Sequence, residues 1–242
     1  MYWTLLAAII SAGGFMRGFS GFGATLVMVP LLSFLMLPSQ AVLLALSIDV
    51  LVMIPIFPKA AKQAEWKPII PLVVGALVAI PLGVWILVMA SPGTMRIIIS
   101  IMVLIFAFLL LSGWSYNGQK TNLLSFIVGI FSGIANGATA IGGPPIAVYF
   151  IAKGMSPVAL RASLNVVAFI MEGLSVITIY SMGSFDISNT IPMLIFAPLM
   201  LIFVWFGSTI FKFVDNKLFN KLILYFLISF AVYILIMTIY DT

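Results

Sequence analysis

The sequence contains no cysteine and no histidine, and only 7% of its 242 residues are charged. The absence of cysteine excludes disulfides and thiolate metal sites. The absence of histidine removes the commonest metal ligand and the usual proton shuttle. A soluble domain carries about 25% charged residues, because water must wet its surface. So few charges, together with 64% hydrophobic residues, predict an integral membrane protein, and we expect no metal, no cofactor and no nucleic-acid partner.

Long apolar runs fill the chain and are separated by short polar segments. Two of them, roughly 3–37 and 123–152, are too long for one crossing and contain glycine-rich stretches near the middle. The other runs suit one helix each, since about 20 residues span the hydrocarbon core. These runs are 40–58, 68–90, 95–114, 157–182, 188–211 and 218–239. We therefore expect an all-α integral membrane fold.

The two glycine-rich stretches, 14–23 and 133–145, align with each other without a gap at an offset of 119 residues. Further along the chain the offset drifts to 124, where Gly83 meets Gly207. This pattern predicts an internal duplication, although chance alignment of apolar sequence is the alternative. The matched pairs in the first alignment include Gly14 and Gly133, Arg17 and Asn136, Gly18 and Gly137, Ser20 and Thr139, and Gly23 and Gly142.

The loop lysines indicate how two such halves are oriented. If each long run crossed the membrane once, the lysines would divide equally between the two sides. If each run instead enters, breaks at its glycines and returns, all eight lysines fall on one side, as expected of cytoplasmic loops. These residues are Lys59, Lys62, Lys67, Lys120, Lys153, Lys212, Lys217 and Lys221.

The second arrangement predicts two inverted-topology repeats, each a glycine-broken helical hairpin plus three transmembrane helices. Repeat 1 is expected over 1–114 and repeat 2 over 123–242, with a cytoplasmic connector at 115–122. Both termini are then expected outside.

The glycine-rich breaks are the first candidate site. Broken backbone at membrane depth is tolerated only inside protein or beside a water-filled cavity. A helix N-terminus created by a break carries partial positive charge and free N–H donors, which suit an anion. Tight helix packing through small residues is the alternative explanation of the glycines. The candidate anion-binding residues in the breaks are Arg17, Gly18, Ser20, Gly21, Gly23, Asn136, Gly137, Thr139, Gly142 and Gly143.

Arg17 is the most informative of these residues. A cation deep in a bilayer costs roughly 2.5–3.5 kcal/mol on insertion scales, so it requires a partner or a role. A guanidinium can bind an oxyanion through two parallel hydrogen bonds. The alternatives are that Arg17 extends to the interface or pairs structurally with Asp49. Asn136 is expected to act as its neutral counterpart in the second half.

Four further polar residues lie in otherwise apolar runs. Arg161 and Asn165 are four residues apart, so they share one helix face and are additional candidates for the anion site. Arg161 is also close to the start of its run, so an interfacial position on the positive inside is the alternative. Asp49 and Glu172 are candidates to bind a coupling proton or sodium ion. A structural role remains open for both: pairing with Arg17 explains Asp49 equally well, and nothing in the sequence decides between the two roles for Glu172. No segment of the sequence contains a pair of acidic residues at helical spacing. Together with the lack of histidine and cysteine, this argues against an intramembrane enzyme.

At these residues the sequence resembles the sulfite exporter TauE/SafE family of membrane transporters. The resemblance covers nearly the whole chain. It rests on the glycine cluster that ends at Gly23 and is followed by Pro30, on its recurrence at 133–145, and on Pro157 with Arg161 and Asn165. It implies transport of a small sulfur oxyanion or organosulfonate across a bacterial-type inner membrane.

We therefore expect a secondary transporter that moves this anion by alternating access. Export of an anion from a cytoplasm that is negative inside is favoured by the membrane potential. The alternatives are an anion channel, a transporter of small carboxylates and a scaffold without transport activity.

Overall fold

The computed structural model describes residues 2–113, 116, 118, 121–182, 191–210 and 216–240, and all regular structure in these segments is helical. In chain order the helices are α1 (Tyr2–Ser20), α2 (Ala24–Leu35), α3 (Pro38–Met53), α4 (Phe57–Gln63), α5 (Trp66–Met89), α6 (Pro92–Leu111), α7 (Asn122–Thr139), α8 (Gly143–Ala152), α9 (Pro157–Ser181), the 3₁₀-helix η2 (Ile191–Phe196), α10 (Ala197–Ile210) and α11 (Asn216–Tyr240). The expected all-α membrane fold is confirmed. Four helices (α5, α6, α7 and α9) are long and apolar enough to cross a membrane, and α3 with α4 forms a fifth candidate span bent by 73°.

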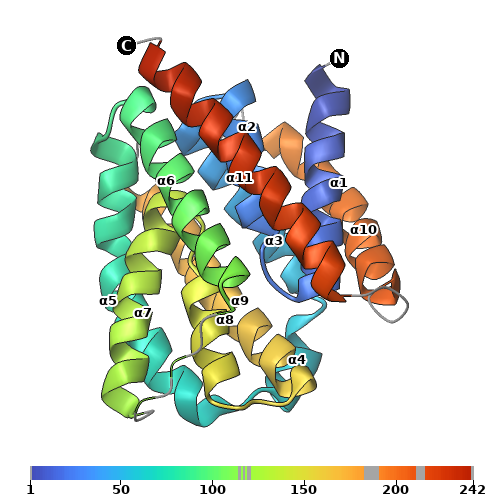
Figure 1. Cartoon of the computed structure of the whole chain (residues 1–242), viewed down its shortest axis with the longest axis vertical. Coiled ribbons are helices and arrows are strands. Elements are labelled where there is room, and N and C mark those ends of the chain that lie inside the picture. Colours follow the sequence, from blue (N-terminus) through green and yellow to red (C-terminus); the bar gives the residue numbers. More distant parts are fainter. Residues whose placement is uncertain are drawn as a thin grey trace.

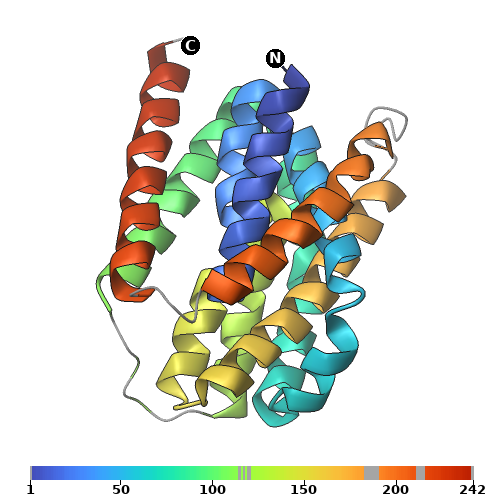
Figure 2. The same cartoon turned by 90° about the vertical axis from the view of Figure 1, so that its right-hand side faces the viewer.

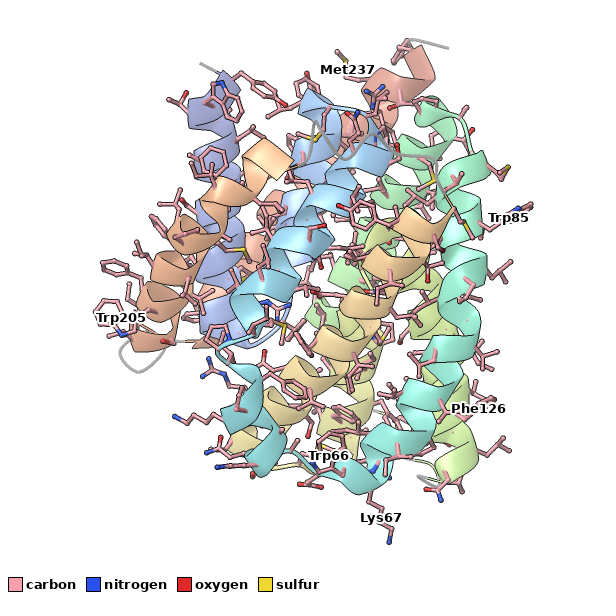
Figure 3. All side chains as sticks on the ribbon, turned by 180° about the vertical axis from the view of Figure 1, so that it is seen from behind. Trp66, Lys67, Trp85, Phe126, Trp205 and Met237 are labelled. Carbon is pink, nitrogen blue, oxygen red and sulfur yellow. The ribbon has the colours of Figure 1, made fainter. Side chains whose placement is uncertain are left out.

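The outer surface of this bundle is apolar. Trp85 and Trp205 point away from the molecule (Figure 3), and 53% and 63% of their surfaces are exposed. An apolar exterior of this extent requires lipid rather than water as the surrounding medium.

Each of the two long sequence runs folds into a helical hairpin. Helices α1 and α2 run in opposite directions in the half of the molecule that holds both termini, and α7 and α8 do so in the other half (Figure 1). The two turns between the helices both lie toward the middle of the molecule (Figures 1 and 2). The long sequence runs are therefore broken, as their length and glycine content predict.

The turns of the two hairpins have the same local structure at matched positions. Gly21 has φ of 83° and Ala140 has φ of 58°. The Gly21 N–H donates to the carbonyl of Arg17 at 2.8 Å, and the Ala140 N–H donates to the carbonyl of Asn136 at 2.7 Å. Since the left-handed region strongly favours glycine, Ala140 carries a strain that Gly21 avoids.

The breaks are shorter than the sequence suggests. Helix α1 continues through Ser20 and α7 continues through Thr139, so only residues 21–23 and 140–142 are non-helical. The prediction that Arg17 and its neighbours lie in irregular backbone is wrong. The physical reason is that most of these glycines serve helix packing, which was the alternative explanation.

The packing of these glycines brings helices of the two halves into close contact. A Cβ at Gly18 of α1 would lie 2.0 Å from the carbonyl oxygen of Val204 in α10, and one at Gly137 of α7 would lie 2.4 Å from that of Ile80 in α5. Backbones can approach this closely only where both surfaces are small. Helix α1 therefore packs along α10, visible in both views of the fold (Figures 1 and 2), and α7 packs along α5.

These contacts repeat at matched positions. Gly18 approaches Val204 O and Ser208 N, and Gly137, its match at the offset of 119, approaches Ile80 O and Val84 N. Ile80 and Val84 are the matches of Val204 and Ser208 at the offset of 124. In the reverse direction, Gly207 approaches the backbone at 15 and 19, and Gly83 approaches it at 134 and 138. Residues matched at the offsets of 119 and 124 therefore make equivalent backbone contacts in the structure.

The described lysines gather at the end of the molecule opposite both termini. Lys67 lies at this end and Met237 at the other (Figure 3). Helix α4, with Lys59 and Lys62, and the α8–α9 turn, with Lys153, lie at the same end as Lys67 (Figures 1 and 3). The side chains of Lys120, Lys212, Lys217 and Lys221 lie outside the part of the chain that is described.

Candidate functional site

An ion cluster around Arg17 lies at the centre of the candidate site. Arg17 is in the last turn of α1, and its side chain is 3% exposed. Its Nη2 donates to Oδ2 of Asp49 in α3 and to Oε1 of Glu172 in α9, the latter at 3.2 Å. The Asp49 and Glu172 side chains are also buried, at 0% and 5% exposure. One buried cation therefore faces two buried carboxylates.

The cluster joins elements that are far apart in the sequence. Arg17 and Glu172 are separated by 155 residues, and Arg17 and Asp49 by 32. Asn165, two turns before Glu172 on the same face of α9, accepts a further hydrogen bond from Arg17 Nη1 at 3.3 Å. The end of α1 is thus held between α3 of its own half and α9 of the other.

Hydrogen bonding in the cluster is incomplete. Arg17 Nε, Asp49 Oδ1 and Glu172 Oε2 are buried side-chain atoms without a hydrogen-bond partner. Each such group loses hydration without compensation, which is costly in a low-dielectric interior. The cluster is therefore poised to bind something further, such as a proton, water or an ion.

A small cavity of about 30 Å³ lies beside this cluster. It is bounded by the first turn of α2, the first turn of α8, the ends of α1 and α7, and one face of α9. Its walls include Arg17, Gly23, Thr25, Leu26, Asn136, Gly142, Gly143, Ile146 and Glu172. A cavity of this size holds water but not a sulfur oxyanion.

Two helix N-termini point into the small cavity. Gly23 precedes α2 and Gly142 precedes α8, and both residues line the cavity. The first N–H groups of a helix lack intrahelical partners, and each N-terminus is equivalent to about half a positive charge. In α8, prolines at 144 and 145 have no N–H, so Gly142 and Gly143 supply the donors nearest the break. This arrangement suits an anion.

A second, wider cavity of about 460 Å³ also borders Arg17. It is lined by residues of α1, the turn after α1, α4, α9 and α10, among them Arg17, Gly18, Gly21, Lys59, Arg161, Asn165 and Ser208. Arg161 donates from Nη2 to the carbonyl oxygen of Gly18 at 2.5 Å. Arg17, Lys59 and Arg161 therefore all line the wide cavity, and Arg17 also lines the small one.

The remaining candidates from the sequence have other surroundings. Ser20 and Thr139 donate to the carbonyls of Met16 and Ala135 at 2.9 and 2.8 Å, and each accepts at 3.3 Å from the N–H two residues on. Their hydroxyls therefore shape the turns and line neither cavity. Gly137 packs against α5.

Asn136 lines the small cavity and donates to Ser175 Oγ at 2.9 Å. Nothing in the sequence indicated Ser175 or the apolar wall of α9. The sequence identified Lys59 only as a loop lysine and did not pair Glu172 with Arg17. No local spacing relates these residues, since they meet only through the packing of α9 against the first half. The run of apolar residues around Glu172 was the only available signal.

The hairpins, the buried ion cluster and the cavities between helix ends are features of a helical membrane protein with a polar interior site. The family described as sulfite exporter TauE/SafE matches residues 5–234. The chain belongs to this family, so it is a membrane transporter and not an enzyme.

A similar curated protein is the probable sulfite/organosulfonate exporter TauE of Cupriavidus necator. The two are 24% identical over 213 residues, which cover 84% of this chain and 81% of the relative. No solved structure is significantly similar to the chain.

Proposed function

We propose that this protein is a secondary transporter that exports a small sulfur-containing anion, sulfite or an organosulfonate, across the inner membrane by alternating access. The observation that carries the proposal is the pair of helix N-termini, from α2 and α8, that face one cavity beside Arg17. Family membership and the printed name of the relative support the class of anion.

The two halves act as inverted-topology repeats, residues 1–114 and 123–242, joined by a connector at 115–122. The equivalent contacts of Gly18 and Gly137 with α10 and α5 support this symmetry. Transporters of this architecture bind substrate where discontinuous helices of the two repeats meet, and one repeat moves against the other around that site.

The lysine-bearing end faces the cytoplasm, as the positive-inside rule expects, with both termini outside. Ser91 and Ser156 are exposed residues in turns at opposite ends, and the chain has no cysteine of its own. Labelling with an impermeant thiol reagent should therefore reach Ser91→Cys, but not Ser156→Cys, in intact cells. The reverse pattern would contradict this orientation.

The substrate path begins in the wide cavity. Lys59, Arg161 and Arg17 create a positive potential that concentrates anions at the cytoplasmic end. The anion then passes Arg17 to reach the helix N-termini, where Asn136, Gly23, Gly142 and Gly143 contact it. The small cavity, at about 30 Å³, must widen to admit it.

The membrane potential favours export of whatever net negative charge crosses with the anion. A potential of 100 mV, negative inside, drives one negative charge outward by about 2.3 kcal/mol. The same site can also exchange anions. After releasing one anion outside, it can bind another there and carry it back to the inside.

Counterflow in proteoliposomes tests the proposal. Vesicles loaded with unlabelled sulfite should accumulate external radiolabelled sulfite transiently and saturably, and vesicles with Arg17→Gln should lose this uptake. Lys62→Gln also removes one positive charge, but at an exposed position of α4, so vesicles with this variant should keep the uptake. Uptake that never exceeds equilibrium and does not saturate would indicate a channel, and preference for a small carboxylate over sulfite and sulfonates would contradict the substrate class.

A further inference from the structure

Resting on the proposed function, we propose that Glu172 is a proton-binding residue whose protonation frees Arg17 and admits one monovalent sulfonate-type anion to the small cavity. The sequence leaves Asp49 and Glu172 as equivalent candidates and leaves the ion open. The geometry distinguishes the two carboxylates and identifies the ion as a proton.

The two carboxylates differ in their surroundings. Asp49 makes the closer contact with Arg17, is completely buried and lines neither cavity. Glu172 contacts Arg17 at the longer distance of 3.2 Å, lines the small cavity and has its second oxygen, Oε2, buried without a partner. Glu172 is therefore the carboxylate that can take up a proton from the cavity and release the guanidinium.

The charges around Glu172 leave one of the two buried carboxylates without a cation. Arg17 of α1 is its cationic partner and Asp49 of α3 its anionic neighbour. On the other elements that pack against α9, the described segments of α5, α7 and α8 contain only Lys67 and Tyr149 as ionisable side chains, and α4 contains Lys59 and Lys62. Lys59 is exposed and lines the wide cavity, and Lys62 and Lys67 are also exposed, so none of them balances the second carboxylate.

With both acids ionised, the cluster has a net charge of −1 in a buried site, and like charges sharing such a site disfavour full ionisation. One proton brings the cluster to neutrality. The N-termini of α2 and α8 then contribute about one positive charge together, which offsets a single negative charge on the anion. A divalent anion would leave an excess charge, so the site prefers a monovalent one.

A sodium ion fits the site less well than a proton. Among the described residues no group of three or more His, Cys, Asp or Glu side chains could hold a metal ion, and the Arg17 guanidinium already contacts both carboxylates. Proton uptake needs no coordination shell, because it uses only the unpartnered oxygen of Glu172.

Methanesulfonate is the appropriate probe, because it stays monovalent across the working pH range and its own protonation cannot cause a pH effect. Its affinity for the purified full-length protein, measured by isothermal titration calorimetry, should rise roughly tenfold for each unit of pH decrease until Glu172 is protonated, since one proton binds with each anion. In Glu172→Gln the affinity should be high and independent of pH. Glu65→Gln, the same change at an exposed position, should behave as the wild type does.

A second measurement on the wild type keeps the test independent of any variant. Adding methanesulfonate to weakly buffered protein above the protonation range should make the solution more alkaline, with uptake of about one proton per anion bound. Binding without proton uptake, or a pH dependence that persists in Glu172→Gln, would overturn this inference and leave the transport function standing. Absence of binding of both methanesulfonate and sulfite at every pH would overturn the proposed function and the inference with it.

Discussion

Arg17 illustrates how a single charged residue is kept inside a membrane protein. Its guanidinium contacts Asp49, Glu172 and Asn165, which come from two different helices. A lone arginine at this depth costs roughly 2.5–3.5 kcal/mol on insertion scales, and the paired acids offset that cost. The same pairing means that Arg17 cannot bind an anion until one acid releases it.

The charge balance of this cluster predicts the effect of removing Arg17. Arg17→Gln should lower the free energy of unfolding by about 3–5 kcal/mol, because two carboxylates remain buried without a cation. The combination Arg17→Gln, Asp49→Asn and Glu172→Gln should recover most of the stability without recovering transport. Thermal unfolding of the detergent-solubilised protein measures this. Equal stability of the single and triple variants would show that the acids do not depend on Arg17.

The sequence predicts the members of this cluster better than their contacts. Arg17, Asp49 and Glu172 stand out because charge is rare in apolar runs, and an Arg17–Asp49 pair is already an alternative at that level. The contact with Glu172 spans 155 residues, and nothing short of the packing of α9 could reveal it. Ser20 and Thr139 match in sequence because they close equivalent turns, a role that the sequence cannot separate from ligand binding.

At the scale of helices, the position of each break depends on what its glycines do. The sequence locates the two broken runs correctly but makes the breaks too long. The sequence alone does not distinguish a glycine needed for close helix packing from one needed for a positive φ. Gly18 belongs to the first kind and Gly21 to the second. In the second hairpin the left-handed residue is Ala140, which no glycine signal could locate.

The close approach of α5 to α7 and of α10 to α1 gives a prediction for matched glycines. A Cβ at Gly83 would lie 2.3 Å from Ile134 O, and one at Gly207 would lie 2.2 Å from Phe15 O. Gly83→Ala and Gly207→Ala should therefore each destabilise the protein by about 1–3 kcal/mol through overpacking.

Gly173 of α9 provides the control, because a Cβ there meets no atom within 4 Å. Gly173→Ala should be neutral or slightly stabilising, since alanine favours the helix. The midpoints of thermal unfolding decide the comparison. A midpoint for Gly83→Ala no lower than that for Gly173→Ala would argue that the α5–α7 approach is looser than described.

At the scale of the whole molecule, each hairpin packs against a helix of the other half. Helix α1 lies along α10 and α7 lies along α5, so the two hairpin turns are carried toward the same central region (Figure 1). This exchange explains why the small cavity has walls from both halves. The two hairpins could be predicted from the length and glycine content of the long apolar runs. The matched glycine contacts agree with the offsets of 119 and 124 residues. The two cavities that share Arg17 could not be predicted, because their walls come from helices far apart in the sequence.

Central to this account is an anion held between the N-termini of α2 and α8. Selenite, the selenium analogue of sulfite, locates such an anion directly through its anomalous scattering in a crystal of the complex. We predict a selenium peak in the small cavity, with selenite oxygens about 2.7–3.2 Å from backbone N–H groups at both helix starts. A peak confined to the wide cavity at Lys59 and Arg161, with the two helix starts unoccupied, would contradict the account.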